Sequence, residues 1–495
     1  MPPTDRTWPA PATLVALFAA GQIAMWTLAP ALTHSAPPLD VVEGYMWGRE
    51  WVIATYKHPA LPSWVLEASR LLTGAVGWPA YLVSQLFVAA AFACVFLLGR
   101  DMMGPERAAA GTLLLAGVAY YAWPTPEFNH NIAEIPFWAG MPLALWRAVE
   151  RRAIGWWLVA AALAAGGLYA KLSAGLLLAT AAAWIVLDAR ARARLATPGP
   201  WIALLMFAAL TAPLAAWLVA NDFAPLQYAA QRSGQRSLAD LPLFVLSTLT
   251  NGVGLLAMLA AAGLLRASPS NEQASPPLPT VDARALRFLA AFTAGPLALA
   301  MIGALSTGTG LKTAWGSSMF NLVGLLAVAL AADRFRPLAL RRIAVFAGVL
   351  LLVVPLAYAL VIGLGPRFAG TLLRVQWPQA EIAERFDAVW ARETGRPLRV
   401  VTGQNWVAGL IGLTAKDRPS IVNNGNLALS PWVTPSRIEA EGALVVWDAR
   451  GQGLPAALAP LLGSRPIGQE RFGRGKAGRE LLINYVVVPP APRRD

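Results

Sequence analysis

Two short polar stretches interrupt an apolar chain: residues 40–47 read DVVEGYMW, and residues 56–64 read YKHPALPSW. They follow the first long apolar run and place two carboxylates, a lysine, a histidine and several aromatic rings in a single connection. Charge at a membrane boundary can stay solvated, so the position alone indicates no function. The dense grouping of acidic, basic and aromatic residues predicts a reaction centre at the membrane interface.

The composition around these stretches is that of a membrane protein. Hydrophobic residues make up 57% of the 495 residues and charged residues 14%, against about 25% charged in soluble domains. The 20 tryptophans are typical of membrane–water boundaries. The net charge of +13 is spread over short loops and the tail, which disfavours nucleic-acid binding. The single Cys94 permits no internal disulfide.

Apolar windows of membrane-spanning length recur up to about residue 363 and then stop. They predict an α-helical polytopic membrane protein of about eleven transmembrane helices. The windows are 11–32, 78–98, 108–123, 134–149, 154–170, 172–187, 201–220, 243–265, 288–305, 316–332 and 343–363. We expect the first window to be a retained span; a cleaved signal peptide is the alternative.

Arginine distinguishes two alternating sets of loops. The rich set holds Arg100 and Arg107; Arg147, Arg151 and Arg152; Arg190, Arg192 and Arg194; Arg266, Arg284 and Arg287; and Arg334, Arg336, Arg341 and Arg342. The positive-inside rule makes this set cytoplasmic. The N-terminus is then cytoplasmic, and residues 40–64 and the C-terminal tail lie on the outer face of a bacterial-type inner membrane.

Beyond residue 363 the composition becomes that of a soluble domain. Strands are predicted at 398–402, 420–422, 443–447 and 481–488, and a short helix at 405–413. About 130 residues are enough to bury a core. We therefore predict a transmembrane domain over residues 1–363, which carries the reaction centre, and an extracytoplasmic α/β domain over residues 364–495.

Asp40 and Glu43 are the candidate general bases. If the stretch is helical, their spacing of three places both carboxylates on one face. A carboxylate near a low-dielectric region can accept a proton, with a pKa set by burial and by neighbouring charges. The alternative is a solvated pair at the interface.

Lys57 and His58 precede a turn that is made rigid by Pro59 and a second proline three residues later. Lysine is a compact positive charge suited to phosphate. Lys312, with Trp315, lies in a loop of small residues that allow a ligand to approach the backbone closely. The alternatives are lysines that snorkel to the interface and a histidine that only forms hydrogen bonds.

A third outer loop, residues 123–136, concentrates polar side chains. Asn129, His130 and Asn131 can hydrogen-bond sugar hydroxyls, although an ordinary solvated turn is the alternative. Lys171, at the outer face, fits an interfacial lysine better than a binding residue. The spacing of the histidines gives no support for a metal site, and no nucleotide-binding or hydrolase motif occurs.

These motifs resemble the GT-C class of membrane glycosyltransferases, the superfamily of protein O-mannosyltransferase-like and aminoarabinose-transferase-like enzymes. The family's Asp-Glu-x-Tyr-Tyr-Trp element is matched by residues 43–47, EGYMW. Its Tyr-x-x-Pro-Pro-Leu element is matched by residues 56–61, YKHPAL, and its Gly-Leu-x-x-Lys element by residues 167–171, GLYAK. The family's aspartate position is Val42 here, so the identity of the base stays open between the two carboxylates.

The resemblance implies an inverting transferase that takes a sugar from a polyprenyl-phosphate donor at the outer face of the membrane. The acceptor hydroxyl would lose its proton to Asp40 or Glu43, and polyprenyl phosphate would leave. Lys57, with Lys312, would stabilise the phosphate charge. The implied substrate contacts are Tyr45, Tyr56, His58, Asn129, His130, Asn131 and Trp315. The reaction needs no cofactor, and use of a divalent metal stays open.

The acceptor is a lipid such as that of lipopolysaccharide, another cell-envelope glycan, or a protein. Two other interpretations fit the same features: a transporter or flippase of lipid-linked sugars, and an inactive scaffold. The charged residues lie near one face and not at the bilayer midplane, and no paired broken helices indicate an inverted repeat. Both observations favour the enzyme over the transporter, and the scaffold stays open.

Overall fold

The computed structural model describes residues 8–233, 240–265, 280–308, 310, 313–369, 372–450, 458–473 and 480–492. The chain forms two compact units. Unit 1 comprises Met1–Leu28, Lys57–Leu61 and Ser84–Leu356, and unit 2 comprises Ala29–Tyr56, Pro62–Val83 and Ala357–Asp495.

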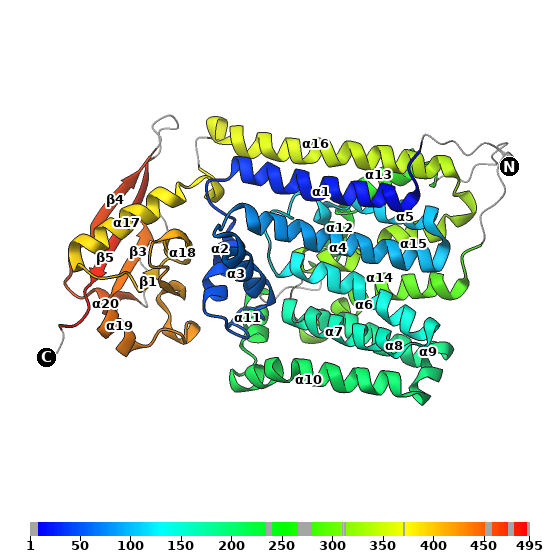
Figure 1. The fold of residues 1–495 in the computed structure, drawn as a ribbon, viewed down its shortest axis with the longest axis horizontal. Helices are drawn as coiled ribbons and strands as arrows, with labels where there is room; N and C mark the ends of the chain where they lie inside the picture. The colour runs from blue at the N-terminus through cyan, green and yellow to red at the C-terminus, as the bar shows by residue number, and fades with distance from the viewer. Residues whose placement is uncertain are drawn as a thin grey trace. The chain divides into compact units, whose positions relative to one another are not determined.

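Unit 1 is a bundle of helices (Figure 1). Its longer helices, three of which run on into unit 2, are α1 (Pro11–Thr33), α4 (Trp78–Met103), α6 (His130–Arg151), α7 (Ile154–Ala170), α8 (Ala174–Leu187), α10 (Pro198–Ala220), α14 (Ala283–Thr307) and α16 (Pro337–Ala369). The shorter ones are α5 (Pro105–Leu113), η1 (Leu114–Gly117), η2 (Ala119–Tyr121), α9 (Ala189–Ala193), η3 (Arg194–Ala196), α11 (Ala224–Ser233), α12 (Asp240–Thr250), α13 (Val253–Ala261), η4 (Thr313–Phe320), α15 (Val323–Leu330) and η5 (Ala332–Arg334).

Five of the described helices are long and apolar enough to cross a membrane: α1, α4, α10, α14 and α16. Two bent pairs, α8 with α9 at 83° and α12 with α13 at 49°, raise the number to seven if each pair is one span. The predicted count of about eleven is therefore not confirmed. Each predicted window does contain helix, but several of these helices are short or broken.

Close backbone contacts explain the broken helices. A Cβ atom added to Gly324 of α15 would lie 2.0 Å from the main-chain oxygen of Gly111 in α5. One added to Gly117 of η1 would lie 2.4 Å from the main-chain nitrogen of Leu255 in α13. Small residues at such crossings let helix backbones come into contact. The bundle therefore includes short helical segments, which a hydropathy window does not distinguish from full spans.

Buried polar side chains bond one another and main-chain oxygens inside the bundle. Gln22 Nε2 donates to Gln85 Oε1 at 3.1 Å and to the main-chain oxygen of Tyr121 at 2.9 Å. The Tyr121 hydroxyl bonds Asn321 Oδ1, and Asn321 Nδ2 donates to the main-chain oxygen of Ile135 at 3.0 Å. Backbone groups without an intrahelical partner need such bonds in a lipid environment.

Unit 2 combines helices with a sheet (Figure 1). Its helices are α2 (Leu39–Arg49), α3 (Leu61–Thr73), η6 (Arg374–Gln376), α17 (Gln379–Thr394), α18 (Asn405–Thr414), η7 (Asn423–Gly425), η8 (Leu427–Leu429), α19 (Pro435–Glu441) and α20 (Ala459–Leu462). The strands are β1 (Val400–Gly403), β2 (Ser420–Val422), β3 (Ala443–Asp448), β4 (Gly468–Phe472) and β5 (Leu481–Val488). Four strands and the short helix after β1 were predicted; β4 was not.

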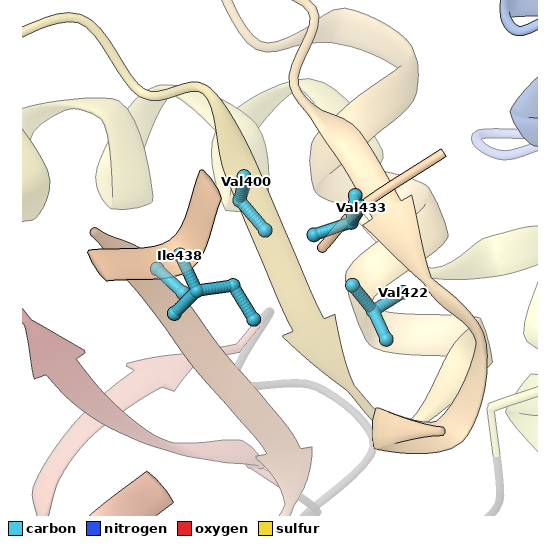
Figure 2. Close-up of a cluster of buried hydrophobic side chains, with 5 residues drawn as sticks. Val400, Val422, Val433 and Ile438 are labelled. Atoms are coloured by element: carbon cyan, nitrogen blue, oxygen red, sulfur yellow. The ribbon is translucent and has the colours of Figure 1, made fainter. Parts of the chain in front are cut away.

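The sheet has the order β2-β1-β3-β5-β4. β1 pairs in parallel with β2 and β3, whereas β5 pairs antiparallel with β3 and β4. One core cluster consists of Val400, Val422, Val433, Ile438 and Ala443, and Figure 2 shows the labelled members converging between strands β1 and β2 and helix α19. The β-branched runs that predicted strands thus form the interior of this domain.

The helices of the first polar connection belong to the same unit as the sheet. A Cβ atom added to Gly409 of α18 would lie 2.5 Å from Val42 Cγ1 in α2. One added to Gly48 of α2 would lie 2.3 Å from the main-chain oxygen of Ser63 in α3. α2 is therefore wedged between α18 and α3. The placement of residues 364–495 outside a membrane stays a prediction.

Candidate active site

In unit 1, the loop that carries Lys57 and His58 is fixed to the start of α6. His130, the first residue of α6, lies with Nε2 3.0 Å from the main-chain oxygen of Pro59 and donates to it. Its ring packs against that of His58, with 4.0 Å between the ring centroids and a tilt of 32° between the planes. Asn129 caps the helix, because its Oδ1 accepts from the main-chain nitrogen of Asn131 at 3.0 Å.

Tyr228 of α11 completes this cluster, and the sequence did not single it out. Lys57 Nζ lies 5.9 Å from the centre of the Tyr228 ring, and the His58 ring lies 6.5 Å from it, nearly perpendicular at 77°. An aromatic face near an ammonium is attractive. Tyr228 therefore restrains the lysine that was predicted to bind phosphate. Arg232, farther along α11, is exposed.

The environment keeps His58 neutral. Burial lowers the pKa of His58 well below its usual value, and the positive charges of His130, Lys57 and Lys171 lower it further. A neutral imidazole can donate one hydrogen bond and accept another. His58 is thus suited to polar contact with a ligand and not to service as a fixed cation.

Glu134 and Lys171 form an ion pair inside the bundle. Lys171 Nζ donates to Glu134 Oε1 at 3.1 Å and to Asn131 Oδ1 at 2.7 Å. Three further donors reach the carboxylate: Ser173 Oγ at 2.7 Å, Trp138 Nε1 at 3.1 Å and Ser318 Oγ at 3.2 Å. Glu134 is 0% exposed and Lys171 7% exposed. The interpretation of Lys171 as an interfacial lysine is therefore wrong.

The local fold aims Lys171 inward. α7 ends at Ala170, and Lys171 takes an extended conformation before α8 begins at Ala174. The break turns the side chain toward α6, where Asn131 and Glu134 sit one turn apart. The sequence held a signal for this contact, since an acid and a lysine beside apolar runs must be paired if they are buried.

In unit 2, both candidate bases lie on α2, so the stretch is helical, which was the condition for their spacing to place them on one face. Asp40 lies in the first turn and is partly exposed, whereas Glu43 is 6% exposed. Tyr45 is wholly buried between α2 and its neighbours, and burial raises its pKa to about 12. Packing accounts for an aromatic residue at this position without a substrate.

Side chains of α2 also bond the sheet. Trp47 Nε1 donates to Asn423 Oδ1 at 3.3 Å, and Arg49 donates to Ser420 Oγ at 2.6 Å. The Tyr56 ring packs edge-on against Trp47, with 6.5 Å between the ring centroids. The α2 segment is thus held in a single orientation by polar contacts as well as by packing.

Glu67 of α3 is a second buried carboxylate that the sequence did not single out. Arg418 binds it through two parallel hydrogen bonds of 2.9 and 3.0 Å, and Arg70 binds it from the next turn of α3 at 2.9 Å. Burial alone would raise the pKa of Glu67, but these arginine bonds outweigh burial and lower it.

The structure thus brings together Lys57, His58 and His130 in unit 1 and, through Lys171, places Asn131 beside Glu134. Lys312 lies outside the described residues, as does the Trp315 side chain. Among the residues that are described, no group of three or more His, Cys, Asp or Glu could hold a metal ion.

Comparison with known proteins finds a family model that matches part of the chain and a solved structure with a similar fold. Residues 57–217 match the family model of dolichyl-phosphate-mannose-protein mannosyltransferases. Among curated sequences, none matches the chain. The crystal structure of ArnT from Cupriavidus metallidurans bound to undecaprenyl phosphate has a similar fold, with a TM-score of 0.61 at 16% identity, over 95% of this chain and 97% of that chain.

Two structures of the Archaeoglobus fulgidus oligosaccharyltransferase are more distant. The complex with zinc and sulfate has a TM-score of 0.40 at 12% identity, over 88% of this chain and 68% of that chain. The apo form has a TM-score of 0.43 at 11% identity, over 88% of this chain and 69% of that chain. The family match and the ArnT-like fold confirm the resemblance to the GT-C class.

Proposed function

We propose that this chain, which has the ArnT-like GT-C fold and matches the mannosyltransferase family model, is an inverting glycosyltransferase. Its donor is a sugar linked to a polyprenyl phosphate. The observation that carries the proposal is the cluster at the start of α6, which includes Lys57, the first residue of the matched region. There Lys57 and His58 are held by His130 and Tyr228.

The donor phosphate is assigned to Lys57. The ArnT relative holds undecaprenyl phosphate, and an ammonium that is fixed by a rigid loop and an aromatic ring is suited to the same chemistry. As the glycosidic bond breaks, charge grows on the departing phosphate, and a pre-positioned cation stabilises it more than it stabilises the ground state. Neutral His58 supplies a hydrogen bond to the sugar or to the phosphate. We assign Lys312 a supporting role at the phosphate.

The acceptor is activated by a carboxylate of α2. Asp40 or Glu43 removes the proton of the acceptor hydroxyl as its oxygen attacks the anomeric carbon, and the polyprenyl phosphate leaves with the bonding electrons. Attack from the face opposite to the phosphate inverts the anomeric configuration. Glu43 is the more buried of the two.

The remaining assignments concern the acceptor and the membrane. We place the reaction at the outer face of a bacterial-type inner membrane, with a cytoplasmic N-terminus and residues 364–495 outside, because the arginine-rich loops then face the cytoplasm. The acceptor is a cell-envelope lipid, glycan or protein. Asn129, His130, Asn131, Tyr45, Tyr56 and Trp315 remain proposed substrate contacts, of which Asn131 and His130 have the most specific surroundings.

Transfer from a mixture of polyprenyl-phosphate sugars to envelope lipids tests the proposal. Asp40→Asn and Glu43→Gln are compared with wild type, and loss of the base is expected to lower the transfer rate about 10²- to 10⁴-fold. Glu50→Gln is the control, since Glu50 is a carboxylate of the same connection that was not proposed as the base; it forms an ion pair with Arg49 at 2.7 Å. Full transfer by both α2 variants, or none by wild type with suitable acceptors present, rejects the proposal and favours a transporter or scaffold.

A further inference from the structure

An apolar groove of about 230 Å³ lies among α6, α7, α8 and α10 of unit 1. Its floor includes Ala160, Ala161 and Ala164 of α7, and its sides include Leu178 of α8 and Phe207 of α10. α7 lies between α6 and α10 (Figure 1). The short alanine side chains leave a channel between larger neighbours. Every lining residue is apolar, so the groove suits a hydrocarbon chain.

The groove occupies the half of these helices next to the arginine-rich loops. On α7, which starts at Ile154, the lining begins at Trp157; on α10, it begins at Pro200. On α8, which ends at Leu187, the last lining residue is Ile185. A chain lying in the groove would therefore end close to the loops at 151–153 and 188–197.

Arginines flank this end of the groove, and three of them have no acidic partner among the residues that the structure describes. Arg152, Arg192 and Arg194 form no ion pair in the described parts of the chain; Arg192 and Arg194 bind main-chain oxygens, at 2.7 and 2.8 Å. The neighbouring arginines are paired: Arg147 and Arg151 with Asp101, Arg190 and Arg284 with Glu150, and Arg284 with Asp188. Uncompensated positive charge is thus concentrated where α7 begins and where α8 connects to α10.

The start of α7 adds to this charge. Arg152 and Ala153 directly precede the helix, and no side chain caps its first turn. The unpaired amides and the helix dipole favour an anion at such an end. Arg152 is exposed and held in the left-handed region at φ 57°, a conformation that is uncommon for a residue with a side chain.

We propose that this groove binds an anionic phospholipid from the leaflet facing the arginine-rich loops. One acyl chain fills the groove over α7, and the head-group phosphate lies against Arg152 and Arg192. The proposed donor site is at the opposite end of α6, about 30 Å away along a helix of 22 residues. The phospholipid is therefore a separate ligand that stabilises the bundle, and its binding does not depend on glycosyl transfer.

Lipid-dependent stability tests the proposal. Delipidated full-length protein in detergent is titrated with dioleoylphosphatidylglycerol, dioleoylphosphatidylcholine or inorganic phosphate, and the melting temperature and the bound lipid by intact-protein mass spectrometry are recorded. Phosphatidylglycerol is expected to bind and to raise the melting temperature; the other two are not. If phosphatidylcholine raised the melting temperature equally, the lipid charge would not matter. If inorganic phosphate did so, the groove would not matter. Either result overturns the proposal.

Matched variants locate the site. Arg152→Gln and Arg192→Gln are each expected to weaken phosphatidylglycerol binding about fivefold. Arg190→Gln removes the same charge from the same loop but is expected to have little effect, because Arg190 already faces Glu150. Ala164→Leu fills the groove and is expected to reduce lipid retention. If Ala164→Leu does not fold, the arginine variants alone decide. The proposal is overturned if Arg152→Gln and Arg192→Gln both leave the affinity for phosphatidylglycerol unchanged, or if Arg190→Gln lowers that affinity equally.

Discussion

Glu134 in unit 1 and Glu67 in unit 2 are both buried carboxylates, but they are neutralised in different ways. Glu134 is reached by one lysine and by hydroxyl and indole donors from α6, the α7–α8 connection and η4. Glu67 is gripped by the guanidinium groups of Arg418 and Arg70. A lysine is a point donor that can bridge several acceptors, whereas the arginine fork matches one carboxylate.

The Glu134 site therefore connects several segments of the chain, whereas the Glu67 site connects two. Glu134 is 0% exposed, so its charge is stabilised only by the assembled helices. Arg418 is 22% exposed at its side chain, so water shares in solvating the second pair. A buried pair costs most when one partner is removed. The Glu134 cluster should therefore be the more sensitive of the two to substitution.

Lys171→Met has the largest expected effect on stability. It leaves the Glu134 charge buried and uncompensated, which should lower the free energy of unfolding by about 3–5 kcal/mol. Titration with sodium dodecyl sulfate in mixed micelles measures this loss. Lys416→Met, at an exposed position, is the control. The double variant Lys171→Met with Glu134→Gln should recover part of the loss; a single variant as stable as the control would contradict the comparison.

Arg418→Met tests the second pair and should have a smaller effect. It removes two charge-assisted hydrogen bonds but leaves Arg70 on Glu67, so we expect a loss of about 1.5–3 kcal/mol. The same titration measures it. Arg385→Met breaks an ion pair with Glu470 whose arginine is 49% exposed and should cost less than about 1 kcal/mol. If Arg418→Met lowered the free energy of unfolding more than Lys171→Met, the order of the two sites would be reversed.

Acid should weaken the Glu67 pair selectively. The pKa of Glu67 is lower in the folded protein than the value of about 4.3 in an unfolded chain. Its stabilising contribution is therefore complete above about pH 4.3 and is lost as the pH falls through the folded-state value. Melting temperatures of wild type and Glu67→Gln should differ by a constant amount at neutral pH and converge below about pH 4.3. A difference that grows in acid would refute the assignment.

Local patterns predicted much of this structure, and contacts between distant residues account for most of what was missed. The condition set for Asp40 and Glu43, that their stretch be helical, is met by α2, and β-branched runs located four strands. Strand β4, Gly468–Phe472, has no β-branched residue and no pattern to reveal it. Lys171 was misread because its partner Glu134 is 37 residues away, and Arg418 lies 351 residues from Glu67.

The span count failed for a related reason. Gly111 and Gly324 meet backbone to backbone, and this contact lets short helices replace full spans. Hydropathy averages over a window and does not register which glycine faces which. Lys57, His58 and His130 were singled out because each belongs to a polar motif that is local in sequence. That they lie together is a finding of the structure, and their roles in transfer stay predictions. Tyr228 was missed since it joins them only in the folded bundle.

Substitution of Tyr228 has the smallest expected effect and is the most specific test, because here an aromatic ring and not a carboxylate contacts the cation, Lys57. Under the proposed function, Tyr228→Ala should lower kcat/KM for the polyprenyl-phosphate donor about two- to fivefold, the effect of losing a cation–π contact with Lys57. Tyr228→Phe keeps the ring face and should stay near wild type. Leu226→Ala, an exposed position on the same helix, is the control. If phenylalanine and alanine reduce donor use equally, the hydroxyl and not the ring is the important group, and the ring's restraint of Lys57 is not what sets donor binding.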